Sequence, residues 1–228
     1  MGAAQEELLR AVSHDLRAPL RHVVSYAGLL REVLQELPEP PGQVREALGF
    51  AATMEQSARR MGLMIDGLQA ISRAARAPLA LAAVDVRAAI EQVRATLADA
   101  AALRWDLPQA MPAVRADAAL LALLLAQVLG NAVKFSRASP RPEVRVEAQD
   151  QGERVRLAIT DNGAGFDPAH AGSLFGVFQR LHREREFDGV GAGLALCKTI
   201  AERHGARIAA ASAGPGRGCT VTLDWPAG

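Results

Sequence analysis

Two heptad repeats separated by a proline-rich turn constrain this chain more than any other feature. Apolar residues recur at alternating spacings of three and four over residues 9–33 and again over residues 44–68. This spacing places them on one stripe of an α-helix. The intervening LPEPPGQ cannot continue a helix, because proline lacks the N–H and clashes with the preceding turn. We therefore predict a helical hairpin over residues 5–74. The two seams are Leu9, Val12, Leu16, Pro19, Val23, Tyr26, Leu30 and Val33, and Val44, Ala47, Ala51, Met54, Ala58, Met61, Ile65 and Leu68.

Further apolar residues widen the face of the first helix beyond a two-helix seam. They are Leu20, Val24, Ala27 and Leu34. Two helices alone bury little, and a second copy completes a four-helix bundle. The pattern therefore predicts a homodimer.

A histidine and an aspartate, His14-Asp15, lie within the first predicted helix. With Leu9 as position a of the heptad, His14 falls at f, which points it away from the seam. Pro19 follows, and its ring clashes with the carbonyl of Asp15 and loosens the helix there. An ordinary surface histidine is the alternative. The exposed imidazole, the carboxylate and the bend together indicate a nucleophile that a large group must approach.

The heptads stop after SRAARAPLA, and the rest of the chain mixes helices and strands. Strands are expected at LALAAVDV and LRWDLP, and helices at RAAIEQVRATLADAAA, DAALLALLLAQVLGNAVKFS and AGLALCKTIAERHG. Alternating segments around Gln151-Gly152 and over ARIAAASAGPGRGCTVTLDW predict two hairpins. The expected fold is an α+β sandwich, an antiparallel sheet with helices on one face.

Composition narrows the class of protein. The 228 residues are 50% hydrophobic with a net charge of +1, so no field favours nucleic acid. Cys197 and Cys219 have no metal-binding spacing and suit a reducing compartment. The longest apolar run, residues 118–126, is far shorter than the ~20 residues of a membrane span. The N-terminus is too polar for a signal peptide. We expect a cytoplasmic piece, with any sensing part in another segment.

Two polar motifs in the second half could bind a nucleotide. In GNAVKF, Asn131 and Lys134 share a helix face, where an amide oxygen suits Mg²⁺ and an ammonium suits phosphate. In ITDNGAGF, Asp161 could accept a hydrogen bond from an adenine amino group, beside Gly163 and Gly165. Taken singly, each motif fits an ordinary helix end or turn equally well.

Two glycine-rich motifs follow. GVGAGL places Gly189, Gly191 and Gly193 before a helix, where backbone N–H groups can hold phosphate. The spacing matches neither the Rossmann fingerprint nor the P-loop. In GPGRG, a flexible hairpin turn is as good an explanation as a ligand role.

The order of these motifs resembles that of sensor histidine kinases over nearly the whole chain. HDLRAPL resembles the H box, GNAVKF the N box, DNGAGF the G1 box, LFGVFQRL the F box, GVGAGL the G2 box and GRG the G3 box. The stretch FQRLHREREFDGVGAGLALCKTIAERHG is most similar to kinases attached to phytochrome-type photosensors.

The resemblance implies a dimerisation and histidine phosphotransfer domain over residues 1–75 and a catalytic ATP-binding domain of the GHKL type over residues 76–228. ATP would phosphorylate His14, with Asp15 helping the imidazole to lose its proton. An aspartate of a response regulator would then take the phosphoryl group. The implied partners are a second copy, that regulator and an upstream sensor domain outside this chain.

The resemblance also assigns the nucleotide site. Asn131 matches the Mg²⁺ ligand, Lys134 a phosphate contact, Phe135 the aromatic residue that packs on the base, and Asp161 the residue that reads adenine. The glycines beside Asp161 and at the base of the phosphate lid are Gly163, Gly165, Gly189, Gly191 and Gly193.

Four positions depart from the family pattern. Ala18 replaces the Thr or Asn that orients water for dephosphorylating the partner, which puts phosphatase activity in doubt. Gln127 replaces the first Asn of the N box and cannot act as the water-activating base of related ATPases. Val190 and Ala192 replace the usual Thr and Leu of the lid. A degenerate kinase that only binds partners and an ATPase of the same fold are therefore the alternatives.

Overall fold

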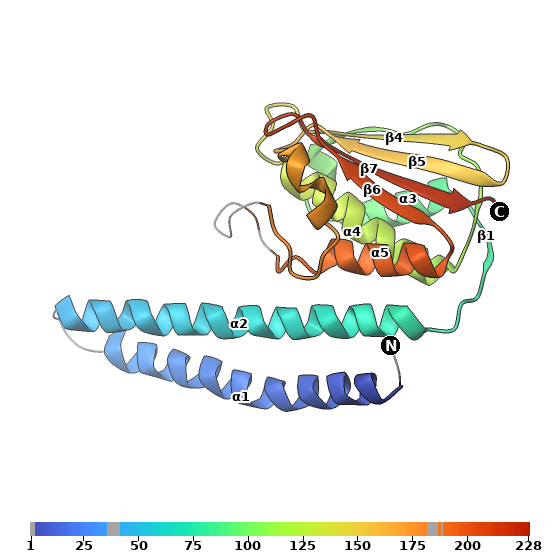
Figure 1. Ribbon diagram of the computed structural model, residues 1–228. Helices are drawn as coiled ribbons and strands as arrows, with labels where there is room; N and C mark the ends of the chain where they lie inside the picture. Colours follow the sequence, from blue (N-terminus) through green and yellow to red (C-terminus); the bar gives the residue numbers. More distant parts are fainter. Residues whose placement is uncertain (1–2, 36–41, 182–186, 188) are drawn as a thin grey trace. The chain divides into compact units, whose positions relative to one another are not determined.

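The computed structural model describes residues 3–35, 42–181, 187 and 189–228 (Figure 1). The side chains of residues 3–15, 18, 42 and 43 lie outside this description. The chain forms two compact units, Met1–Ser72 and Arg73–Gly228.

The first unit is the predicted helical hairpin. Helix α1 spans Ala3–Gln35 and continues through Pro19, and α2 spans Gly42–Arg76 and extends into the second unit. Arg17 links the two helices through hydrogen bonds to Asp66 and Gln69. Farther along, Arg31 and Arg59 bond the nearly buried Glu55. These polar contacts set how the two helices align.

The hairpin packs through a different row of α1 from the predicted seam. Ala27 is 3% exposed and lies in the hairpin core, whereas Tyr26 is 71% and Val33 63% exposed. The row expected only to widen the apolar face is thus the more buried one. On α2 the seam residues Ala51, Ala58 and Ile65 are buried, but Met54 and Met61 between them are half exposed. A continuous apolar stripe is therefore uncovered in the single chain. Its α1 part consists of Leu16, Val23, Tyr26, Leu30 and Val33.

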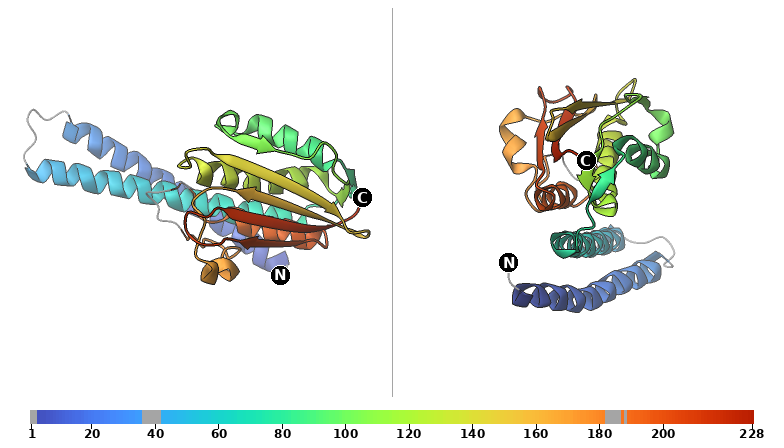
Figure 2. Two further views of the ribbon diagram at one scale, coloured as in Figure 1. Left: turned by 90° about the horizontal axis from the view of Figure 1, so that it is seen from above. Right: turned by 90° about the vertical axis from the view of Figure 1, so that its right-hand side faces the viewer.

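The second unit is a five-stranded sheet with helices on one face, as expected (Figures 1 and 2). The strand order is β2-β4-β5-β7-β6, and a separate pair joins β1 to β3. The strands are β1 Ala82–Val84, β2 Arg104–Asp106, β3 Val114–Ala116, β4 Glu143–Asp150, β5 Arg154–Asp161, β6 Arg207–Ala211 and β7 Cys219–Pro226. The helices are α3 Val86–Thr96, α4 Ala118–Ser136 and α5 Gly193–Arg203, with short 3₁₀ turns at Ala100–Ala102 and Pro168–Ser173.

The expectation of a wholly antiparallel sheet was wrong at one edge. Strand β2 pairs parallel to β4, while the remaining neighbours in this sheet are antiparallel. Strand β3 was not predicted at all. Strand β3 spans only three residues, too short for alternation to reveal it, whereas the equally short β2 lies within the predicted strand LRWDLP.

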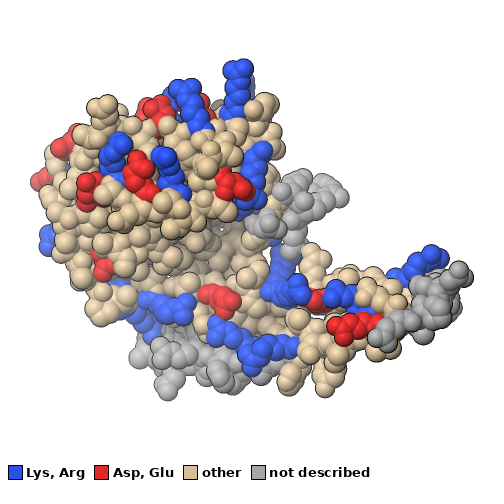
Figure 3. Space-filling view, turned by 180° about the vertical axis from the view of Figure 1, so that it is seen from behind, with Lys and Arg blue, Asp and Glu red and all other residues tan. Residues whose placement is uncertain are grey.

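Helix α4 forms the centre of this unit's core. Leu121, Leu125 and Leu129 are fully buried, together with Leu157 and Trp225 of the sheet. Among the described helices, α4 alone is long and apolar enough to cross a membrane. Its packing in this core accounts for that composition. The face of the molecule in Figure 3 carries interspersed acidic and basic side chains.

Candidate nucleotide site

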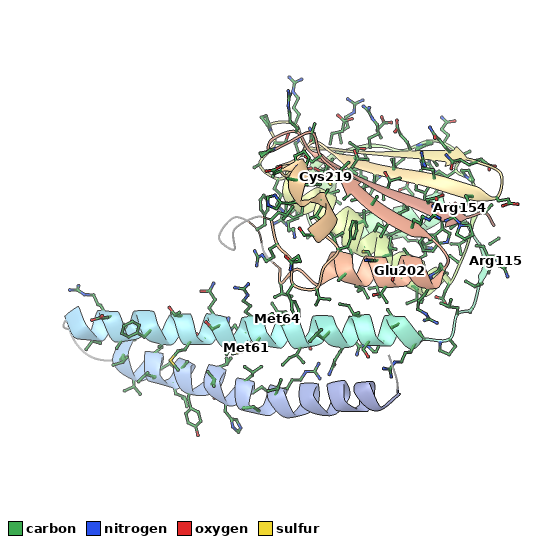
Figure 4. The ribbon with its side chains drawn as sticks, in the orientation of Figure 1. Met61, Met64, Arg115, Arg154, Glu202 and Cys219 are labelled. Carbon is green, nitrogen blue, oxygen red and sulfur yellow. The ribbon has the colours of Figure 1, made fainter. Side chains whose placement is uncertain are left out.

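The four polar and glycine-rich motifs of the second unit converge at one end of the sheet. They occupy the C-terminal turns of α4, the loop after β5, the loop before α5 and the β6–β7 loop. Cys219, at the start of β7, marks this end of the sheet in Figure 4. The topology thus assembles segments that are up to about ninety residues apart in the sequence.

The loop after β5 packs directly on the end of α4. A Cβ on Gly163 would overlap the carbonyl oxygen of Phe135, and Ala164 N–H donates to that oxygen at 3.1 Å. Gly163 was expected to allow a ligand close to the backbone. The close approach that requires glycine here is that of helix α4, so a structural role suffices for it.

The β6–β7 loop fixes the same segment from the other side. Gly218 N–H donates to Gly163 O at 3.1 Å, and Gly216 N–H donates to Ala164 O at 2.6 Å. Gly165 has a φ of +58°, and a Cβ there would overlap the carbonyl oxygen of Gly214. The GPGRG motif is therefore a backbone brace for the loop after β5.

Ser212 is a bracing residue of the site that none of the motifs contains. Its Oγ accepts hydrogen bonds from Phe166 N–H (3.1 Å) and Gly214 N–H (3.2 Å) and lies 2.7 Å from Gly218 O. It therefore ties the β6–β7 loop to the loop after β5. No sequence signal distinguishes it from other loop serines.

Asp161 ends β5 and is a buried residue, 7% exposed. Its Oδ1 accepts a hydrogen bond from Gly163 N–H at 2.9 Å. Burial raises the pKa of Asp161 to about 6, although hydrogen bonds from the backbone of Gly163 and Cys219 oppose the shift. Burial and the Asp161 charge raise the pKa of the neighbouring Cys219 thiol to about 12. A carboxylate has about four lone-pair sites, so Asp161 retains capacity for a ligand N–H.

One face of α4 lies against the glycine motif before α5. A Cβ on Gly193 would overlap Gln127 Oε1, and one on Gly189 would lie 3.9 Å from Lys134 Nζ. Asn131 is four residues after Gln127 and three before Lys134, so it shares this face. The structure thus brings Lys134 close to Gly189 and Gln127 close to Gly193, and helix spacing places Asn131 between them on the same face.

The aromatic position Phe135 contacts Phe187 and Lys134. Its ring packs edge-on against Phe187 with 4.7 Å between centroids, and Lys134 Nζ lies 4.3 Å from its centroid. Arg180 donates to the carbonyls of Phe187 and Gly189. These contacts hold the start of the G2-like segment near α4.

Gly191 joins the G2-like and F-like motifs. Its φ is +77°, its carbonyl accepts from Phe178 N–H at 2.9 Å, and a Cβ on it would overlap Gln179 O. Only glycine fits this position without moving the F-like segment. All three glycines of GVGAGL therefore contact another motif of the site.

A cavity of about 420 Å³ opens between these loops. This volume lies within the range of small-molecule sites. Of the predicted site residues, only Gly165 lines it. The lining residues are Gly165, Phe166, Asp167, His170, Ser173, Gln179, Arg180, Leu181 and Pro215.

Mg²⁺ fits this site only as an ion shared with phosphate. Within the described residues, no group of three His, Cys, Asp or Glu side chains could hold a metal. Mg²⁺ at phosphate sites commonly takes one or two protein oxygens, with phosphates and water completing its octahedron. The half-buried amide of Asn131 suits that arrangement.

The predicted phosphoacceptor pair is placed only in part. The backbone of His14 and Asp15 is helical, within α1, but their side chains and that of Ala18 lie outside the described ones. The orientation of His14 therefore stays a prediction.

A helical hairpin is followed by a sandwich in which three loops and the end of α4 converge beside a buried aspartate, an arrangement suited to a two-part nucleotide-binding protein. Two family models match: His Kinase A (phospho-acceptor) domain over residues 4–76, and histidine kinase-, DNA gyrase B- and HSP90-like ATPase over residues 116–228. The chain belongs to the sensor histidine kinases and represents their two-component transmitter core.

Named relatives and one solved structure match this chain over nearly its whole length. Cyanobacterial phytochrome A of Nostoc sp. is 31% identical over 95% of this chain and 28% of its own length. Alginate biosynthesis sensor protein KinB of Pseudomonas aeruginosa is 32% identical over 97% of this chain and 36% of its own length. The solved structure of full-length ShkA in complex with AMPPNP has a TM-score of 0.65 and 25% identity, covering 97% of this chain and 46% of that one. The chain thus spans about a quarter to a third of these two curated relatives.

Proposed function

We propose that this chain is an active protein-histidine kinase. His14 would attack the γ-phosphorus of ATP, forming an N–P bond as the bond to the β-phosphate oxygen breaks and ADP leaves. Neutral imidazole is the nucleophile, and Asp15 accepts the proton that the ring loses. The phosphoryl group then passes to an aspartate carboxylate of a response regulator, which frees His14.

The observation that carries this proposal is the buried Asp161 beside the end of α4 and the three converging loops. Asp161 would accept the adenine amino group, with Phe135 packing on the base. Lys134 would contact phosphate, and Asn131 would hold Mg²⁺, which neutralises phosphate charge during transfer. Backbone N–H groups of Gly189, Gly191 and Gly193 would follow the phosphates at the start of α5; Gly163 and Gly165 shape the base pocket.

The uncovered stripe of the hairpin supports a homodimer. A monomer seldom leaves a continuous apolar stripe in water, and a second copy covers it by forming a four-helix bundle. We assign dimerisation and phosphotransfer to residues 1–75 and ATP binding to residues 76–228. The phytochrome relatives suggest an upstream photosensor-type domain, and use of ATP suits a cytoplasmic location.

The alternatives, a degenerate kinase and an ATPase, make different predictions. Gln127 lacks the basicity to activate water, which favours transfer to His14 over hydrolysis. Incubation with γ-labelled ATP should give protein-bound label that survives base and is lost in acid, as a phosphohistidine requires. Release of inorganic phosphate without labelled protein would indicate an ATPase, and neither product would indicate a scaffold.

A further inference from the structure

The C-terminal end of α5 is bonded to the end of α2. Arg203 Nη1 donates to the carbonyl oxygens of Ala74 at 2.8 Å and Ala77 at 2.6 Å. The last carbonyls of a helix have no partner within the helix, and a cation there also complements the helix dipole. Arg203 therefore caps α2 from a position more than 120 residues later in the sequence.

The segment after α2 is bonded to the same unit. Ala80 N–H donates to Asp117 Oδ2 at 3.0 Å, while Asp117 Oδ1 caps the start of α4. Asp117 N–H donates to His204 Nε2 at 3.0 Å, and His204 Nδ1 lies 2.7 Å from Ile200 O. Strand β1 then pairs with β3. Hydrogen bonds and strand pairing thus hold the stretch from Ala74 to β1 against the rest of the nucleotide unit.

Helix α5 connects the hydrogen bonds of Arg203 to the candidate phosphate site. It begins at Gly193, next to Gln127, and ends at Arg203. An α-helix of this length, about 16 Å, behaves as a short rigid rod. The boundary between the two compact units falls at Ser72, inside α2 and just before the turn that Arg203 caps.

We propose that Arg203 is a positioning residue that makes the last turn of α2 part of the nucleotide unit. The cap holds this turn at a fixed place beside α5. Without it, the last turn of α2 and the connecting segment Ala77–Leu81 loosen together, and transfer loses its geometry. The inference rests on the proposed kinase activity for its kinetic part only.

The first test measures amide hydrogen exchange over residues 73–81 in the full chain. Arg203→Met keeps the aliphatic stem but removes the donors, so exchange should rise about ten- to a hundred-fold. Arg203→Lys should restore part of the protection. Lys198→Met is the matched control, because it removes the same charge from an exposed site on α5, one turn before Glu202 (Figure 4). Unchanged exchange in Arg203→Met would overturn the proposal.

The second test separates positioning from folding. In Arg203→Met we expect the autophosphorylation kcat to fall on the order of tenfold, with ATP affinity within twofold of the parent chain. A parallel loss of ATP affinity would mean that Arg203 only stabilises the fold, and an unchanged kcat would remove its kinetic role. If the parent chain itself acquires no label, the proposed kinase function fails, while hydrogen exchange still decides whether the cap exists.

Discussion

The hairpin and the sandwich solve the problem of burying apolar surface in opposite ways. The sandwich encloses its core completely, with residues such as Leu125 and Trp225 fully buried. The hairpin buries one row of small residues and leaves larger ones, such as Tyr26 and Val33, in contact with solvent. A unit that leaves such residues uncovered depends on a partner, whereas a closed unit can carry a binding site at its edge.

The largest effect should come from His14→Gln. If the hairpin supplies the phosphoacceptor and the sandwich supplies ATP, this change should abolish protein labelling while ATP binding and assembly persist. Gel autoradiography with γ-labelled ATP measures protein labelling. Calorimetry measures ATP binding, and sedimentation measures assembly. Label retained on the variant would place the acceptor elsewhere.

Leu30→Glu tests the uncovered stripe. Leu30 is 47% exposed in the single chain, so a monomer should tolerate glutamate there. In a dimer each interface would bury two such charges, and the dimer dissociation constant should rise on the order of a thousandfold or more. Sedimentation equilibrium reads this directly. Glu32→Gln, at an exposed position on the same helix, is the control. A dimer that survives Leu30→Glu would mean that the uncovered stripe is not the dimer interface.

Asp161→Asn tests the buried carboxylate of the closed unit. Replacing one acceptor oxygen with a donor should weaken ATP by about ten- to a hundred-fold, the cost of a charge-assisted hydrogen bond. Calorimetry on the full chain measures it. Unchanged affinity would mean that the base binds elsewhere.

The pH dependence of that affinity sharpens the same comparison. The pKa of Asp161 is raised to about 6, so the carboxylate is ionised at pH 7.5 and largely protonated at pH 5. Affinity for ATP should therefore fall more steeply in the parent chain than in Asp161→Asn as pH drops through about 6. The folding stability of the parent chain relative to Asp161→Asn should instead rise as the pH falls. The folded chain holds this proton more tightly than the unfolded one, so the parent gains stability relative to Asp161→Asn between pH 6 and about 4.

The smallest expected effects contrast glycines of the two units. Gly49 has open space around its α-carbon in α2, and Gly49→Ala should stabilise the hairpin by about 0.5–1 kcal/mol. Gly163→Ala forces a methyl group into the backbone of α4 and should destabilise the sandwich by about 1–3 kcal/mol. Urea unfolding of both variants measures the difference. Equal effects would deny that the two units differ in packing.

Much of the fold and site was predictable because it depends on local patterns. The heptads and the proline turn determined the hairpin, and alternation around Gln151-Gly152 determined the β4–β5 pairing. The order of the motifs predicted Asn131, Lys134 and Asp161 as site residues without any knowledge of distance. What could not be predicted depended on neighbours remote in sequence, as with the brace formed by Ser212, the short strand β3 and the parallel pairing of β2 with β4.

The sequence by itself thus determined the helices, most of the strands and the side chains that are candidates for chemistry, since periodicity and residue type are local properties. Only the tertiary structure decided which apolar row of α1 packs on α2, because several rows were hydrophobic enough. It also decided that Gly163 is required by the carbonyl of Phe135, and that Arg203 caps α2. Such contacts join atoms that are far apart along the chain, so neither periodicity nor residue type predicts them.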